Sequence, residues 1–398
     1  MTDDRRETWI TGLGIVSCLG EGPDAHWRRF NEAPPLPDAS AFAPYIIHRM
    51  PPLEFDKQIP RKGDQRQMEL WQRIGTYAAG LALDSAGAKG NAELLAGMDM
   101  IVAAGGGERD ESVDTTILTG LPKAERPQSY LNERLMSDLR PTLFLAQLSN
   151  LLAGNISIVH GVTGSSRTFM GEEAAGVDAV RIALARVAGG QSNIILVGGS
   201  YNAERNDQIL LYATGGHALK DRFVPVWERA ARGGGIALGS IGAFLVLEER
   251  DHALARKAKP LARLSSVQSD RASRQAGSLM AALSRLWSGI SSKLRPGRLA
   301  IISGASGAEP ATSEERAWLE TMPDIPMRAT GTYLGHGFEP QFPLNIALAT
   351  MALEHEKLPA PAVSSELERG MDGGLQQVVV TGVGHWRGEG MALVEAVR

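Results

Sequence analysis

The chain has 398 residues, 43% of them hydrophobic and 22% charged, a composition typical of a globular protein with a large core. The formal net charge of −4 excludes a general basic field for nucleic acid, and no apolar run is long enough to span a membrane. The opening MTDDRRETW lacks the apolar stretch of a signal peptide, so we expect a cytoplasmic protein. Cys18 is the only cysteine, which excludes an internal disulfide, and we expect no metal or cofactor site.

Five short β-branched runs, each followed by glycine, recur along the chain. They cover residues 9–16, 100–107, 194–199, 299–304 and 378–384. Such continuous apolar runs are typical of strands buried on both faces. Ala- and Leu-rich segments at 71–88, 176–188 and 343–355 predict helices. The pattern therefore predicts an α/β fold in which helices cover a central sheet, with the Pro-rich segment 34–62 as a surface excursion.

Two pairs of segments resemble one another. Residues 100–108 resemble 300–309, and residues 10–14 resemble 380–384. This internal similarity predicts two pseudo-equivalent α/β halves, residues 1–250 and residues 260–398. The charged stretch 247–259 is the expected connector.

Five longer segments, taken in order, resemble the β-ketoacyl-acyl-carrier-protein synthases of the KAS II-like type. They begin WITGLGIVSCLG, PRKGDQRQMELW, NISIVHGVTGSS, FVPVWERAARGG and TGTYLGHGFEPQ. The resemblance implies a thiolase-like fold, with its two halves in a layered α-β-α-β-α arrangement. It also implies acyltransferase chemistry by a Cys-His-His triad on an acyl carrier protein. Because a fold alone does not fix a function, each triad position has to be read in this sequence.

The nucleophile position of the family is a glutamate here. His160-Gly161, Gly164 and Gly176 align with the family pattern, and the nucleophile lies three residues before the last glycine, at Glu173. In the family a cysteine thiolate takes the acyl chain there as a thioester. A carboxylate would form an anhydride instead, which hydrolyses readily. We interpret Glu173 as an inert or structural group in that pocket, the alternative being an ordinary exposed helix start.

Of the two family histidines, one is retained. Alignment on Pro310 places Ala305 at the first histidine position, so that imidazole is absent. Gly335-His336 keeps the second histidine, but the family's lysine position reads Gly331. With these partners missing, we interpret His336 as a structural residue more readily than as a catalytic one.

The family loop that supplies a gating aromatic residue and an oxyanion turn corresponds to residues 384–390. His385 takes the place of the gating aromatic residue, and Trp386 and Arg387 replace small residues. We expect these bulky side chains to fill space that an active enzyme keeps open. Together with Gly331 they form the expected substrate-pocket set.

Of the Cys-His-His triad, one member therefore remains, while the surrounding segments still resemble those of the family. The resemblance implies a non-condensing homologue, similar to a chain length factor, that forms a heterodimer with an active ketosynthase subunit in fatty acid or polyketide elongation. The acyl carrier protein is the second implied partner, with Arg61, Lys62 and Arg66 as candidate contacts.

Two alternatives stay open. The first is an active β-ketoacyl-acyl-carrier-protein synthase with a non-standard site, in which Cys18 would be the only available thiol. The second is a malonyl-carrier-protein decarboxylase that relies on Glu173 and His336. Removal of a single acid or base group typically costs about 10²–10⁴ in rate, which disfavours both.

Overall fold

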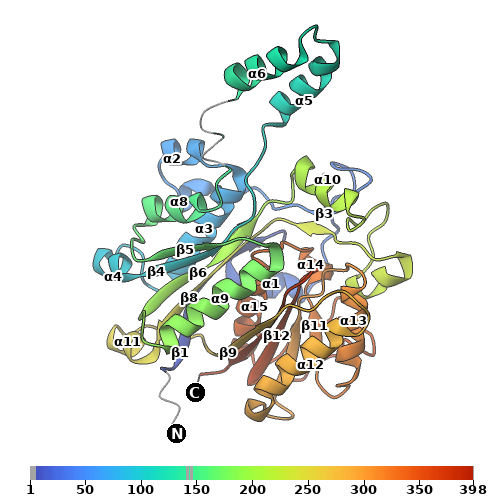
Figure 1. Cartoon of the computed structure of the whole chain (residues 1–398). Coiled ribbons are helices and arrows are strands. Elements are labelled where there is room, and N and C mark those ends of the chain that lie inside the picture. Colours follow the sequence, from blue (N-terminus) through green and yellow to red (C-terminus); the bar gives the residue numbers. More distant parts are fainter. Residues whose placement is uncertain (1–5, 140–142, 144–146, 398) are drawn as a thin grey trace.

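A computed structural model describes residues 6–139, 143 and 147–397 (Figure 1). The strands are β1 (Thr8–Ser17), β2 (Gly20–Glu21), β3 (Ile47–His48), β4 (Asp99–Ala103), β5 (Ser166–Phe169), β6 (Ile194–Tyr201), β7 (Leu238–Gly239), β8 (Ile241–Glu249), β9 (Ala262–Asp270), β10 (Leu299–Ser303), β11 (Met327–Ala329), β12 (Gln377–Val383) and β13 (Glu389–Glu395). The α-helices are α1 (Gly22–Phe30), α2 (Lys62–Gln67), α3 (Leu70–Ser85), α4 (Ala92–Gly97), α5 (Glu111–Gly120), α6 (Pro127–Asp138), α8 (Leu151–His160), α9 (Glu172–Ala188), α10 (Asn206–Thr214), α11 (Arg250–Ala255), α12 (Ser278–Ile290), α13 (Ala311–Glu320), α14 (Gly331–Leu334) and α15 (Gln341–Glu354). Short 3₁₀ helices are η1 (Phe55–Lys57), η2 (Leu121–Lys123), η3 (Val226–Arg232) and η4 (Ser291–Lys293).

The central sheet repeats one strand order in its two parts. Its path runs β11-β10-β12-β13-β9-β1-β8-β6-β4-β5. Read outward from the centre, β1, β8, β6, β4 and β5 in the first part match β9, β13, β12, β10 and β11 in the second. In both parts the two strands nearest the outer edge run parallel, as in β4 with β5 and β10 with β11. This repeated order supports the predicted halves, whose boundary near residues 250–260 stays a prediction.

The helices complete a layered arrangement around this sheet. Helices α9 and α15 contact one another and strands from both parts of the sheet, so they form the central layer. Helix α3 packs on the outside of β1, β8 and β6, and α12 packs on β9 and β13. The α/β, thiolase-like fold class expected from the sequence is therefore confirmed (Figure 1). None of the helices within the described ranges is long and apolar enough to cross a membrane.

The predicted elements agree with the structure at the five β-branched runs and the three helical segments. Strands inside the sheet such as β6 and β8 are buried along their whole length, because helices cover both faces. The segment 34–62 is largely irregular, although Ile47 and His48 form the buried strand β3, which pairs with β7.

The expected connector 247–259 is not a free linker. Its first three residues end β8, and α11 follows directly. Glu248 is fully buried in β8 because its carboxylate accepts hydrogen bonds from Thr11, His252 and Arg256. Charge in a sequence therefore does not by itself mark exposed chain, because paired charges can lie inside a sheet.

Candidate functional site at the start of helix α9

The chain enters α9 through a tight, left-handed turn. Gly171 has φ +132° and Glu172 has φ +57°, a conformation that side chains other than glycine adopt rarely. The helix also approaches the segment after α14 closely, because a Cβ atom at Gly176 would lie 2.3 Å from the carbonyl oxygen of Glu339. These two features direct the side chains of Glu172 and Glu173 toward the loops at residues 336–339 and 384–388.

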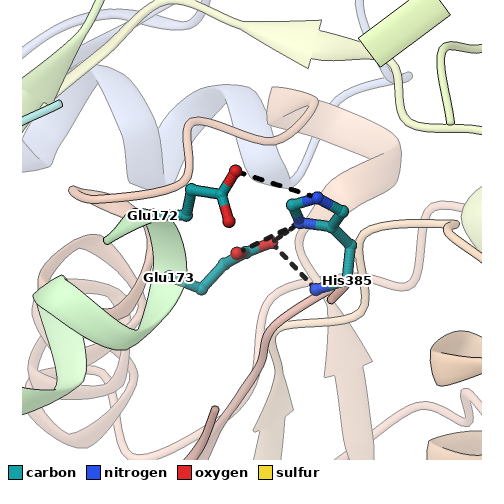
Figure 2. Close-up of side chains that lie close together, drawn as sticks. All are labelled: Glu172, Glu173 and His385. Atoms are coloured by element: carbon teal, nitrogen blue, oxygen red, sulfur yellow. Dashed lines mark hydrogen bonds and ion pairs between the residues drawn. The ribbon is translucent and has the colours of Figure 1, made fainter. Parts of the chain in front are cut away.

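Glu173 is the centre of a buried hydrogen-bond cluster (Figure 2). Its side chain lies within hydrogen-bond distance of two imidazoles: His336 Nε2 at 2.9 Å from Oε1, and His385 Nδ1 at 3.1 Å from the same oxygen. The backbone N–H of His385 also donates to Oε1, at 3.2 Å. Glu173 is 4% exposed, so it is not the exposed helix start considered as an alternative.

The Glu173 carboxylate and the His385 imidazole each stabilise the charged form of the other. Burial alone would raise the pKa of Glu173, but hydrogen bonds to His336 and His385 outweigh it and hold the pKa well below its usual range. Burial alone would lower the pKa of His385, and the Glu173 carboxylate reverses this and raises it. The cluster therefore holds a buried, anionic carboxylate at the start of α9.

Aromatic rings enclose the cluster on one side. Phe338 is fully buried, and it stacks on Tyr212 with ring centroids 4.3 Å apart and also meets the rings of His336 and His385 edge-on. Next to it lies a cavity of about 280 Å³, lined in part by Glu172, Tyr212 and Glu339. Burial and the nearby carboxylates raise the pKa of Glu339 to about 7. The ring of Phe338 thus takes up space beside the nucleophile position.

Ala305 and Gly331, which the sequence resemblance predicts at the first-histidine and lysine positions, lie against each other. A Cβ atom at Gly331 would be 2.7 Å from the carbonyl oxygen of Ala305, so no side chain fits there without backbone movement. Ala305 packs with Val226 and Ala329 in a small buried apolar cluster. This corner of the site contains no acid or base at either of the two positions.

The C-terminal loop differs from its expected role. Trp386 is 63% exposed and Arg387 is exposed as well, so neither fills a buried pocket, and that part of the sequence interpretation is wrong. Physically, the turn at Gly388 directs both side chains to solvent, while His385 alone turns inward to Glu173. Only His385 among the three lies in the buried site.

Cys18 lies outside this cluster. Its thiol donates to the carbonyl oxygen of Tyr333 at 3.2 Å, and His48 Nδ1 lies 3.8 Å from the sulfur. The base that the sequence did not indicate is thus present, but desolvation lowers the pKa of His48 to about 3 and raises the pKa of the thiol to about 12. A thiolate–imidazolium pair is therefore disfavoured.

We expect Cys18 to react with a thiol reagent at pH 8 at least about 100-fold more slowly in the folded protein than in urea, because the thiolate fraction is small. Absorbance of the released thionitrobenzoate measures both rates. Rapid modification of the folded chain would instead favour an active Cys18.

Several residues of the site were not found from the sequence. Glu172, Tyr212 and Phe338 lie on three segments that only the fold brings together. A sequence signal existed for one of them: Glu172 directly follows Gly171, and paired glutamates after a glycine are unusual at a buried helix start. Phe338 and Tyr212 look like ordinary core residues in sequence.

Comparison with known proteins identifies the family of this chain. The family described as "Beta-ketoacyl synthase, N-terminal domain" matches residues 5–253. The chain is 25% identical over 274 residues to "3-oxoacyl-[acyl-carrier-protein] synthase 2" of Vibrio harveyi, covering 65% of this chain and 62% of that protein. It is 28% identical over 272 residues to "Tetracenomycin polyketide synthase ketoacyl synthase beta subunit" of Streptomyces glaucescens, covering 63% and 60%. The matches thus span less than two thirds of these relatives.

Two solved structures cover nearly the whole chain. "The ishigamide ketosynthase/chain length factor" superposes with a TM-score of 0.78 at 17% identity, covering 99% of this chain and 100% of that one. A β-ketoacyl synthase from Burkholderia phymatum STM815 superposes with a TM-score of 0.76 at 16% identity, with the same coverage. At this identity the superpositions report on the fold alone. The matching family model, the curated relatives and the shared fold together show that this chain belongs to the β-ketoacyl synthase family, with KAS II-like relatives.

Proposed function

We propose that this chain is a non-condensing subunit, similar to a chain length factor, that pairs with an active ketosynthase and helps to set the length of an acyl or polyketide chain. The observation that carries the proposal is the state of the nucleophile position. Glu173 is held there by His336 and by the side chain and amide of His385. A carboxylate with these partners is stable as an anion, and it forms no thioester.

The missing acid and base groups support the same proposal. Ala305 and Gly331 form an apolar corner at the positions where the resemblance implies a histidine and a lysine in condensing enzymes, and a side chain at Gly331 would collide with the Ala305 carbonyl. The decarboxylase alternative is less well supported for this reason, because it would have to rely on Glu173 and His336 without a second histidine at Ala305. His336 already contacts Glu173 through Nε2.

An open sheet edge offers a surface for the partner. Within the described part of the chain, β5 pairs with β4 and with no strand on its other side. The exposed side chains of Ile158 in α8 and of Met170, which directly follows β5, flank this edge. An unpaired edge with apolar neighbours is a template for strand addition from another chain. Names of relatives such as "ketosynthase/chain length factor" also favour pairing.

The helical pair α5–α6 extends from the same side of the body and supports an extended partner surface (Figure 1). Leu118 of α5 and Met136 of α6 are exposed, and no residue of α6 is buried. Helices with this pattern are more stable when another surface covers their apolar side chains. We infer that the partner subunit supplies that surface.

A carrier-protein contact through α2 has weaker support. Arg61 pairs with Asp64 at 3.0 Å and Lys62 pairs with Asp56 at 2.5 Å, so two of the three candidate cations already have acidic partners. Exposed pairs of this kind are weak, and an acidic carrier protein can compete for them. This contact stays a prediction.

The pairing is tested at Thr168. The backbone N–H of Ala104, which directly follows β4, donates to the carbonyl oxygen of Phe169 at 3.0 Å, so the backbone of Phe169 faces β4. Because successive residues of a strand turn their backbone N–H and C=O groups to opposite sides, the N–H of Thr168 faces the open edge. We expect Thr168→Pro, which removes that N–H, to abolish co-purification with the Cys-containing ketosynthase of the same gene neighbourhood. Thr168→Val, which keeps the N–H, is the matched control and should co-purify.

The product assay completes the test. With malonyl-carrier protein, the complex should give longer or more uniform chains by mass spectrometry than the ketosynthase alone, and the present chain should carry no acyl adduct. Steady conversion of malonyl- to acetyl-carrier protein by the isolated chain, lost in His336→Ala, would replace this proposal with the decarboxylase alternative.

A further inference from the structure

A cavity of about 540 Å³ lies at the β11 edge of the central sheet, and it shares no residue with the Glu173 site. It is bounded by η3, the end of α13, β11 and the segment 363–367. Its walls are mainly apolar and include Trp227, Leu319, Met322, Ile325, Met327 and Val363. Cavities that bind small molecules typically have volumes of about 300–1,000 Å³ and linings of this kind.

The wall formed by β11 carries a backbone N–H that has no partner in the described part of the chain. The carbonyl oxygen of Pro326 faces β10, because the N–H of Ile301 donates to it at 2.9 Å. In a trans peptide unit the C=O and the N–H point in opposite directions, so the N–H of Met327 points away from β10. Neither the pairing with β10 nor another hydrogen bond of the described residues uses this N–H, although Met327 is only 1% exposed. Buried N–H groups normally have an acceptor, so this one indicates an oxygen atom of water or of a ligand in the cavity.

An added peptide strand does not fit this edge. The N–H of Ala329, the next one that points away from β10, already donates to Glu368 at 3.0 Å. The side chain of Arg328 donates to the carbonyl oxygen of Met327. Strand addition needs a row of free N–H and C=O groups, and these two contacts interrupt it. A small ligand with one acceptor therefore suits the edge better than a peptide.

The charged side chains around the cavity are mostly acidic. Glu228 and Glu366 line it, and neither forms an ion pair with a described residue. Arg316 also lines it, but Glu320 pairs with this guanidinium at 2.8 Å. The excess of carboxylates disfavours an anionic ligand.

We propose that this cavity binds a small neutral molecule with a planar apolar body and one carbonyl oxygen, which accepts a hydrogen bond from the N–H of Met327. The indole of Trp227 and the adaptable side chain of Met327 provide an apolar surface for such a body. Trp227 also packs against the small apolar cluster around Ala305, so the ligand lies one layer of side chains away from that corner of the Glu173 site. The inference goes beyond pairing with a ketosynthase and does not depend on it.

Naphthaleneacetamide is a suitable probe, because it combines a planar apolar body with a neutral carbonyl group. Calorimetric titration of the full chain should show one binding site. Naphthaleneacetate, the acid of the same shape, should bind about fivefold more weakly at low ionic strength, because Glu228 and Glu366 repel it. Glu228→Gln combined with Glu366→Gln should reduce that difference and leave binding of the amide unchanged.

Two variants test the cavity and the donor separately. Val363 is 44% exposed, so the larger side chain of Val363→Trp can enter the cavity without disturbing the core, and it should weaken binding of the amide at least about tenfold. Val363→Ala is its control and should bind the amide. Met327→Pro removes the free N–H and should weaken binding about three- to tenfold, whereas Met327→Leu keeps the N–H and should retain binding. Circular dichroism checks that each variant is folded.

Three results would overturn the proposal. They are no binding of naphthaleneacetamide to the unaltered chain, unchanged binding in both Val363→Trp and Met327→Pro, and binding of naphthaleneacetate as tight as that of the amide. In the first two cases the N–H of Met327 would be satisfied by water alone. Each result is obtained with the isolated chain, so it is distinct from success or failure of co-purification with a ketosynthase.

Discussion

Glu173→Ala should lower the free energy of unfolding by about 3 kcal/mol, because it removes one partner of a buried charged pair and leaves the imidazoles of His336 and His385 without it. Urea unfolding followed by circular dichroism, with EDTA present to exclude metal effects, measures the change. Glu173→Gln should cost less, since it keeps an oxygen acceptor of the same shape.

The matched control is Glu172→Ala. Its side chain is 39% exposed and the hydrogen bond that it accepts from Tyr212 is long at 3.5 Å, so we expect a change within about 1 kcal/mol. Equal stability of Glu173→Ala and the unaltered chain would mean that the buried cluster does not hold the site together.

The second large effect concerns Glu315 and pH. Glu315 lies in α13, is fully buried, and accepts hydrogen bonds from Ser303 at 2.9 Å and from Thr381 at 2.5 Å. Burial raises its pKa to about 7, and the two hydroxyl groups offset only part of that rise. Because the folded-state pKa lies above the unfolded one, the folded state binds more protons between pH 4.5 and 7. The contribution of Glu315 to stability is therefore full below that window and is lost as the pH rises through it.

Glu315→Gln should remove this dependence while retaining the oxygen that Ser303 and Thr381 contact. The difference in unfolding free energy between Glu315→Gln and the unaltered chain should change by on the order of 3 kcal/mol between pH 4.5 and 8, in favour of the glutamine variant at the higher pH. Glu339 titrates in the same range in both proteins, so the difference isolates Glu315. If the unfolding free energies of the two proteins changed with pH in parallel, Glu315 would not be protonated in the folded chain as proposed.

Most of the fold could be predicted from the sequence, because buried parallel strands leave long β-branched runs with glycine at their ends. β6 and β12 show this pattern along their whole length. Glu248 shows what the sequence could not reveal. The charged stretch 247–259 was expected to be a connector, but Glu248 lies buried in β8, where Arg256 eight residues later pairs with its carboxylate and Thr11, far away in sequence, donates a hydrogen bond to it.

The site was predicted only in part. Glycine spacing placed Glu173 at the nucleophile position, and the structure brings it together with His336 and His385. Trp386 was misplaced because sequence gives the size of a side chain and not the direction in which a turn sends it. Tyr212 could not be found, since nothing in the chain marks α10 as a neighbour of residues far along the sequence.

The close approach of Gly331 to Ala305 limits how this site can be redesigned. A lysine introduced at position 331 would collide with the Ala305 carbonyl, so that substitution requires a backbone change as well. A cysteine placed at position 173 alone would also leave position 305 without an imidazole, so we expect no single substitution to give this chain condensing activity.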